Sequence, residues 1–130
     1  MTLYGLVLAI GMIALIALVV DGGAKLAAAR QATAIAEEAA RAAAGQADLP
    51  TAYTSGIYRI DRQAALNAAQ TYLAATGHRG SVRVTGPTTI EVTVRIQQPT
   101  LMLSAIGISE ISVQSTAQAH LVTGVTGPSR

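Results

Sequence analysis

The chain has 130 residues, of which 51% are hydrophobic and 12% are charged, with a formal net charge of +2 and no cysteine. This hydrophobic content excludes an intrinsically disordered chain, because disorder requires low hydrophobicity and high net charge. The lack of cysteine excludes disulfides, thiol chemistry and Cys-ligated metal sites, and the small, scattered basic excess argues against nucleic acid as a partner.

Residues 1–20 contain no charged side chain, and the first charge in the chain is Asp21. A helix over this segment would be about 30 Å long, which matches the hydrocarbon thickness of a bilayer. It also lacks the polar face that a helix on the surface of a soluble protein would have. These features predict a transmembrane helix over residues 1–20, with membrane lipid as its partner and Asp21 at the membrane edge.

Two other interpretations of this segment remain open. A cleavable signal peptide would carry a basic region ahead of the apolar run, and no basic residue precedes it here. A soluble helix buried in a partner protein is the other alternative. The charge bias also leaves the orientation open: Lys25 and Arg30 would place the C-terminal side in the cytoplasm, whereas a basic leader ahead of the apolar run would reverse this.

The next segment, residues 21–48, is rich in alanine, the residue with the highest helix propensity. Nothing in it breaks a helix until Gly45 and Pro50. We therefore expect one continuous helix that begins near Leu3, crosses the membrane and ends near Ala47.

Five alanines of this segment recur at four-residue spacing and therefore share one face of the helix. Small side chains let helix backbones approach closely, so the pattern predicts an assembly surface that packs against helices of partner subunits. The alternative is an alanine-rich spacer that only stays helical. We call this face the alanine ridge; it consists of Ala28, Ala32, Ala36, Ala40 and Ala44.

Residues 49–130 have the pattern of a small α+β domain. Asp61 can cap a helix that Gly77 ends, and the segments after it alternate apolar with polar residues, as in an antiparallel sheet with one buried face. The whole chain is thus expected to be α+β, with a long N-terminal helix before a small domain of one helix and an antiparallel sheet. The expected elements are a loop over 49–60, a helix over 61–76, strands over 81–85, 89–97 and 111–122, a short apolar helix or wide turn over 101–107, and a tail over 124–130.

Residue patterns typical of catalysis or metal binding are missing from the sequence. His78 and His120 have no other His, Cys or carboxylate at ligand spacing, and Glu37 and Glu38 would point about 100° apart on a helix. The Gly-x-x-Gly at residues 77–80 matches the loop of a KH domain, but this is a weak signal and a helix end followed by a turn explains it better. We therefore predict no enzyme activity, no catalytic residue, no cofactor and no metal.

Taken together, these segments resemble a known family. The apolar helix that runs into Val20-Asp21-Gly22-Gly23, followed by Arg30-Gln31 and then Ala36-Glu37-Glu38-Ala39-Ala40, is similar to the TadE/TadG-like proteins of the tight-adherence (Flp-type) pilus machinery. Segments 103–108 and 113–119 are similar to the end of those domains. The resemblance implies a pilin-like fold, a structural, minor pilin-like role in pilus assembly, other pilin-like or assembly subunits as partners, and a domain outside the cell.

One motif departs from the family's processed members. Class III prepilin processing uses a glycine followed five residues later by a glutamate, whereas here Ile10 follows Gly5 and Ile16 follows Gly11 at that spacing. The chain therefore resembles the TadG-like, unprocessed or atypical branch more closely. The alternative function is a membrane-tethered binding module, whose domain captures a soluble ligand or peptide through the edge of its sheet.

Overall fold

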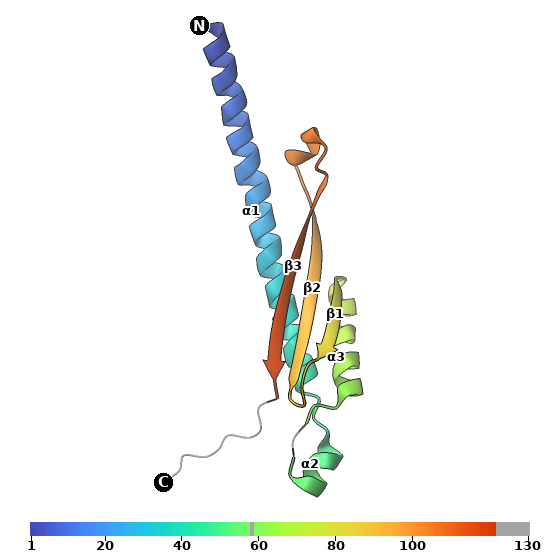
Figure 1. Ribbon diagram of the computed structural model, residues 1–130. Helices are drawn as coiled ribbons and strands as arrows, with labels where there is room; N and C mark the ends of the chain where they lie inside the picture. Colours follow the sequence, from blue (N-terminus) through green and yellow to red (C-terminus); the bar gives the residue numbers. More distant parts are fainter. Residues whose placement is uncertain (58, 122–130) are drawn as a thin grey trace, which may run out of the picture.

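The computed structural model describes residues 1–57 and 59–121 (Figure 1). The chain is α+β as predicted, with a long N-terminal helix before a smaller helix and a three-stranded antiparallel sheet. The predicted tail over 124–130 and the last residue of the predicted final strand, Val122, lie outside the described residues. The elements in chain order are α1 (Thr2–Ala44), α2 (Leu49–Ser55), α3 (Arg62–Thr76), β1 (Arg79–Val84), β2 (Thr89–Pro99), the 3-10 helix η1 (Leu103–Ile106) and β3 (Glu110–His120).

Helix α1 is a single helix of 43 residues, which confirms the prediction of one continuous helix through the apolar and alanine-rich segments. Gly22 and Gly23 do not interrupt it, and it ends at Gly45, three residues before Asp48 and the Leu-Pro step. Its N-terminal half projects away from the sheet, whereas its C-terminal half lies along the strands (Figure 1). The two halves of α1 therefore have different surroundings: the first half is free of the domain, and the second half packs against the sheet.

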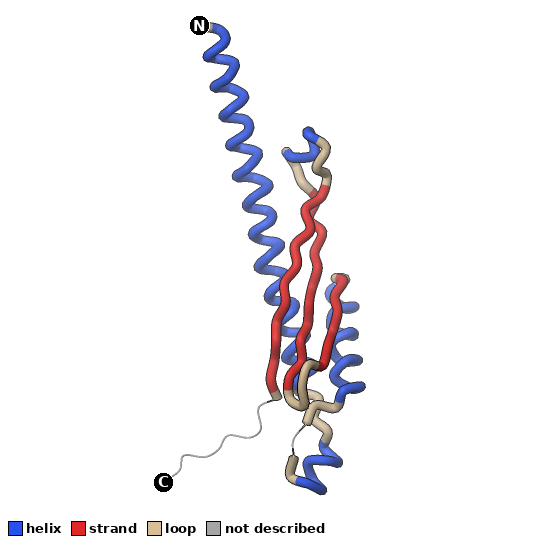
Figure 2. Tube along the Cα trace, in the orientation of Figure 1, coloured by secondary structure: helices blue, strands red, loops and turns tan. Residues whose placement is uncertain are grey.

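The three strands form a sheet in the order β1-β2-β3, and both neighbouring pairs are antiparallel. Residues alternate between the two faces, as predicted: Val92 pairs with Val82 on one side and with Ala117 on the other, and all three face the core. Strands β2 and β3 extend beyond β1 as a long hairpin whose tip points the same way as the N-terminal end of α1 (Figure 2).

The domain has two layers, with the sheet in one and the C-terminal half of α1 together with α3 in the other. Helix α3 begins at Asp61, whose side chain accepts a hydrogen bond of 3.1 Å from the Ala64 amide, and it ends at Gly77 with φ of +72°. Both ends agree with the prediction. The core between the layers is built from small helix residues and branched strand residues, including Ala36, Ala40, Ala65, Ala69, Leu73, Ile90, Val92, Val94 and Val113.

The prediction of a loop over residues 49–60 is wrong for its first half, where α2 forms. Asp48 caps this helix: its carboxylate accepts hydrogen bonds from the Thr51 amide at 3.2 Å and from the Thr51 hydroxyl at 2.6 Å. Pro50 lies in the first turn, where the missing N–H has no helical partner to lose. Proline, which suggested a loop, here favours the start of a helix, and Gly56 ends it with φ of +67°.

Candidate functional site

The N-terminal half of α1 is apolar and exposed along its length. Large side chains such as Leu8, Ile13 and Leu18 have more than half of their surface accessible, and within the described part of the chain nothing buries the most apolar stretch of the helix. An exposed apolar surface of this size is unfavourable in water. By length and composition, α1 is a candidate membrane span.

The alanine ridge lies in the core of the chain's own domain. Ala32, Ala36 and Ala40 have no accessible surface, and Ala28 and Ala44 are also buried. They pack against the inner face of the sheet, where Ile90, Val92 and Val94 fill the space that small helix side chains leave. The prediction that the ridge packs against partner subunits is therefore wrong, because residues later in the same chain cover it.

This packing also changes the predicted domain boundaries. Residues 21–48 and 49–130 had been treated as a helical continuation and a separate domain, yet the second half of α1 forms one layer of that domain's core. The sheet would lose the cover of its inner face without this helix. The domain as the structure describes it therefore begins within α1.

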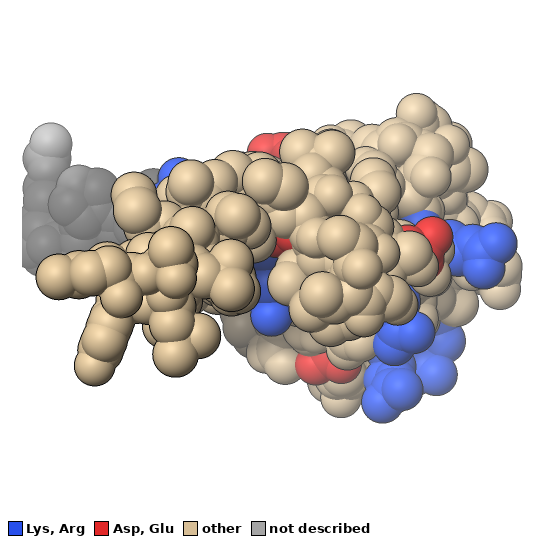
Figure 3. Space-filling view, turned by 90° about the horizontal axis from the view of Figure 1, so that it is seen from above, with Lys and Arg blue, Asp and Glu red and all other residues tan. Residues whose placement is uncertain are grey.

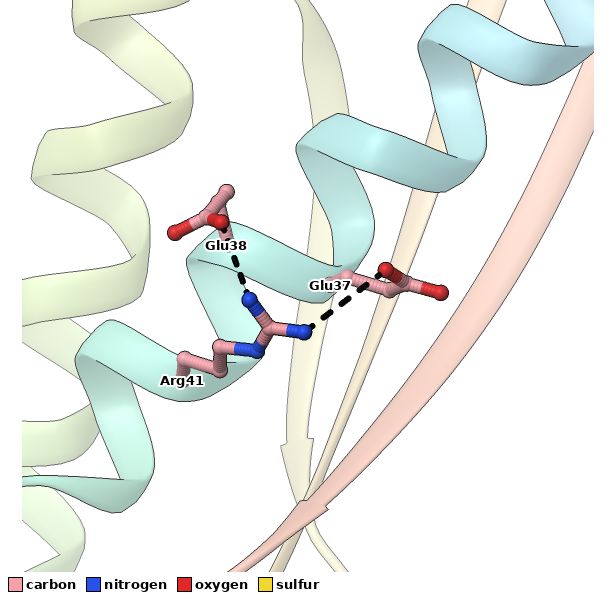
Figure 4. A network of polar contacts seen from close by, with 3 residues as sticks. All are labelled: Glu37, Glu38 and Arg41. Atoms are coloured by element: carbon pink, nitrogen blue, oxygen red, sulfur yellow. Dashed lines mark hydrogen bonds and ion pairs between the residues drawn. The ribbon is translucent and has the colours of Figure 1, made fainter.

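The face of α1 opposite the alanine ridge is polar and exposed, and it carries a small ion-pair network (Figure 4). Arg41 lies between two carboxylates: its Nη1 is 3.1 Å from Glu38 Oε1, and its Nη2 is 4.0 Å from Glu37 Oε2. All three side chains are more than half exposed, and surface ion pairs of this kind contribute about 0–1 kcal/mol. The two glutamates are thus an ion-paired, solvated pair.

The sequence predicts that Asp21 only marks the membrane edge. In the structure its side chain also makes a buried contact with a distant segment of the chain. It is 2% exposed, and its carboxylate accepts three backbone hydrogen bonds from the segment that follows β2. The donors are the amides of Leu101 at 2.9 Å, Met102 at 3.1 Å and Leu103 at 2.7 Å. The Asp21 carboxylate therefore ties the end of the hairpin to α1, and we call this contact the Asp21 latch.

The latch also affects the protonation of the carboxyl group. The hydrogen bond from the Leu101 amide, with those from Leu103 and Met102, stabilises the charged form and lowers the pKa of Asp21 from its ordinary value of 3.8, although burial opposes the shift. The group is therefore ionised at neutral pH, as acceptance of three N–H bonds requires. Sequence reasoning missed this role because backbone amides leave no trace in the residue pattern.

The segment that the latch holds is the hairpin tip, which we define as residues 100–109. It contains η1, which ends at Gly107 in the left-handed conformation, with φ of +91°. Its large apolar side chains point outward: Leu101 and Ile106 are 73% and 72% exposed, and Met102 and Ile108 are exposed as well. The prediction of a short apolar helix or wide turn over 101–107 is thus confirmed, and its apolar side chains form an exposed surface.

The outer face of the sheet carries a second feature, a shallow open depression of about 630 Å³. Arg79 and Arg95 line it and lie directly opposite each other in the β1–β2 register. Like charges in directly opposite positions repel each other. On its other side, Arg95 Nη2 donates a hydrogen bond of 3.0 Å to Gln114 Oε1 on β3. Lys and Arg atoms gather on the side where α3 and β1 lie (Figure 3). The depression is suited to an anionic group.

Within residues 1–57 and 59–121, no three His, Asp or Glu side chains come close enough together to hold a metal ion. His78 lies at the rim of the depression, and its Nε2 is 3.4 Å from Gln31 Nε2. His120 lies on the outer face of the sheet, and its Nδ1 is 2.9 Å from Thr89 Oγ1.

Comparison with protein-family models, with curated proteins and with solved structures finds no match to this chain. Functional inference therefore depends on the geometry described above and on the residues that carry the family resemblance.

Proposed function

We propose that the protein is a single-pass, membrane-anchored structural component of a tight-adherence pilus machinery, of the minor pilin-like kind. In this proposal α1 anchors the chain, the α+β domain lies outside the cell, and the partners are other pilin-like or assembly subunits. The protein acts by packing against them and performs no catalysis.

The observation that carries the proposal is the division of α1 into two halves. Its first half is uncharged and exposed, whereas one face of its second half is buried under an antiparallel sheet of the same chain. A helix that is apolar all round is stable in lipid or among other apolar helices. Such a helix, continuous with a small folded domain, supplies an anchor and an assembly element together, which agrees with the residues shared with TadE/TadG-like proteins.

Because the alanine ridge is occupied, we assign assembly to the exposed half of α1, residues 3–20. Packing between subunits there would proceed through apolar side chains within the membrane or within a filament core. A single cysteine introduced at Ile13 tests this, since the chain has no native cysteine. We expect disulfide-linked species from Ile13→Cys in membranes and only monomer from a control, Tyr53→Cys, on α2. Monomer from both variants would contradict this assignment.

Membrane anchorage has its own experiment. Full-length protein should remain in the membrane pellet after carbonate extraction, because an inserted helix of this length is not removed by high pH. A variant without residues 3–20 retains the second half of α1 and should appear in the soluble fraction with its helices and sheet intact by circular dichroism. Extraction of the full-length protein by carbonate would disprove the anchor.

The basic depression favours a second candidate function, the membrane-tethered binding module. In that case an acidic peptide or anionic ligand would contact Arg79 and Arg95. Replacing Arg95 by Gln would then weaken capture of the ligand while membrane anchorage and crosslinking through Ile13→Cys stay unchanged. A pilus component would show the opposite pattern, in which Arg95→Gln has no effect on assembly.

A further inference from the structure

The hairpin tip presents an apolar surface that no other described part of the chain covers. Its ten residues carry no charged side chain, and Leu101, Met102, Ile106 and Ile108 are all exposed. Exposed apolar groups that lie together at the end of a hairpin mark a contact surface, since single exposed residues are common but clusters are not.

The position of the tip indicates what covers it. The Asp21 latch holds the backbone of residues 101–103 against the first charged residue after the apolar half of α1. From there the tip continues toward the N-terminal end of α1 rather than away from it (Figure 1). Seen from that end, the atoms nearest the viewer are almost all uncharged (Figure 3). The tip therefore continues the apolar surface of the candidate span.

Most of the backbone amides of the tip are satisfied within the chain, which lowers the cost of placing them in an apolar environment. Three amides donate to Asp21, and those of Thr100, Ala105, Gly107 and Ile108 donate to backbone carbonyls of the same hairpin. The side chains follow the same rule: the Ser104 hydroxyl donates to the Leu101 carbonyl at 2.9 Å, and the Thr100 hydroxyl donates to the Ile108 carbonyl. Seven of the ten backbone amides of the tip therefore have a hydrogen-bond partner within the chain.

We propose that the hairpin tip inserts into the interfacial layer of the same bilayer that α1 crosses, so that the chain contacts lipid at two points. This inference rests on the proposed membrane anchorage. The second contact fixes the tilt and rotation of the domain relative to the membrane, because anchors at the interface set both for a spanning helix. Asp21 is the positioning residue, since it holds the tip at the level where the span ends.

The experiment uses four single-cysteine variants of the full-length protein, each labelled with an environment-sensitive fluorophore and reconstituted in phosphatidylcholine vesicles. Ile106→Cys reports on the tip, and Ile13→Cys reports on the span. Tyr53→Cys is the matched control, because Tyr53 is an exposed apolar residue (87% accessible) on α2, at the other end of the domain (Figure 1). Quenching is measured with nitroxide-labelled lipid and, separately, with iodide in the water. Ile108→Cys repeats the measurement at a second tip position.

We expect the labels at 13, 106 and 108 to be quenched by the labelled lipid with blue-shifted emission, and the label at 53 to be quenched only by iodide. Lipid quenching at 13 combined with iodide quenching at 106 and 108 would overturn the inserted tip and leave the anchor standing. Protection of 106 and 108 from both quenchers would also overturn it, since protein would then cover the tip. Iodide quenching at 13 would instead disprove the anchor itself.

Discussion

Asp21 and Leu103 are separated by 82 positions in the sequence, yet the Leu103 amide donates a 2.7 Å hydrogen bond to Asp21 Oδ2. This contact closes the longest loop that the described side chains form with the backbone, together with the bonds from Leu101 and Met102. It connects the first charged residue of α1 to the far end of the hairpin. The fold is therefore fastened at two places, by the core and by this latch.

The latch predicts a pH dependence of stability. Because the hydrogen bonds lower the pKa of Asp21 in the folded state, its contribution is complete above the unfolded value of 3.8 and is lost as the pH falls through the folded value. Asp21→Asn keeps the shape but replaces one accepting oxygen by an amide donor, which faces the N–H groups. We expect this variant to melt below the wild type at pH 7, with a difference that narrows as the pH is lowered below 3.8. A constant difference across this range, measured by circular dichroism in detergent, would contradict the charged latch.

The alanine ridge predicts a difference between two alanines on the same helix. Ala36 is buried against the sheet and Ala34 is exposed, while leucine and alanine have similar helix propensity. Ala36→Leu should lower the free energy of unfolding by about 1–3 kcal/mol through overpacking. Ala34→Leu should change it by less than about 0.5 kcal/mol, as exposed substitutions usually do. Equal denaturation midpoints for both variants would show that the ridge is not packed.

The register of the sheet predicts that neighbouring strand residues on opposite faces differ in their tolerance of a charge. Val92 faces the core with no accessible surface, and its neighbour Thr93 faces outward, where its hydroxyl lies 2.9 Å from that of Thr116. A carboxylate at position 92 would be buried without a partner, at a cost of several kcal/mol against a total stability of about 5–10 kcal/mol. Val92→Asp should therefore unfold the domain, as should Val113→Asp on β3. Thr93→Asp and Gln114→Asp should remain folded by circular dichroism, and unfolding of all four would mean that the register is shifted by one residue.

The close packing around Gly80 predicts that two glycines of the chain differ in their tolerance of an added side chain. A Cβ atom at this position would lie 2.6 Å from the Thr93 carbonyl oxygen and 2.9 Å from Leu73 Cδ1, so β1 would have to move away from β2 or α3. Gly80→Ala should cost about 1–3 kcal/mol in urea denaturation, as overpacking does. At Gly45 the nearest atoms to an added Cβ lie at 3.6 Å and 3.7 Å, and Gly45→Ala should be tolerated. A tolerated Gly80→Ala would show that α3 and β1 are less closely packed.

Alternation and capping made the sheet and α3 predictable, since Ile90, Val92 and Val94 repeat every second residue and Asp61 and Gly77 end the helix. The role of the alanine ridge was not predictable in the same way. Small residues at four-residue spacing suit packing against a helix or against a sheet, and the sequence pattern is identical for a partner in another subunit and a partner later in the chain. Pro50 suggested a loop, although a proline in the first turn after an aspartate, here Asp48, is also typical of a helix start.

Of the candidate site, the sequence predicts the apolar span but neither the Asp21 contact nor the exposure of the tip. The candidate span follows from composition alone, because a helix that crosses lipid needs apolar residues at nearly every position. Asp21, by contrast, binds backbone amides, which every residue but proline offers, so nothing at positions 101–103 indicates the contact. For the tip the sequence predicts only a short apolar helix or wide turn, since exposure depends on where the hairpin ends in space.

The burial of the alanine ridge sets an order for folding. During synthesis or export from the N-terminal end, α1 is complete long before β2 and β3, the strands that cover it, become available. Closing so long a loop is slow, because contacts distant in sequence require the chain entropy to be lost first. Until β3 arrives, part of the ridge and the β2 edge lack their cover, and unpaired surfaces of this kind favour aggregation and proteolysis. We therefore expect a chain that stalls ahead of Glu110 to be prone to degradation until the last strand pairs with β2.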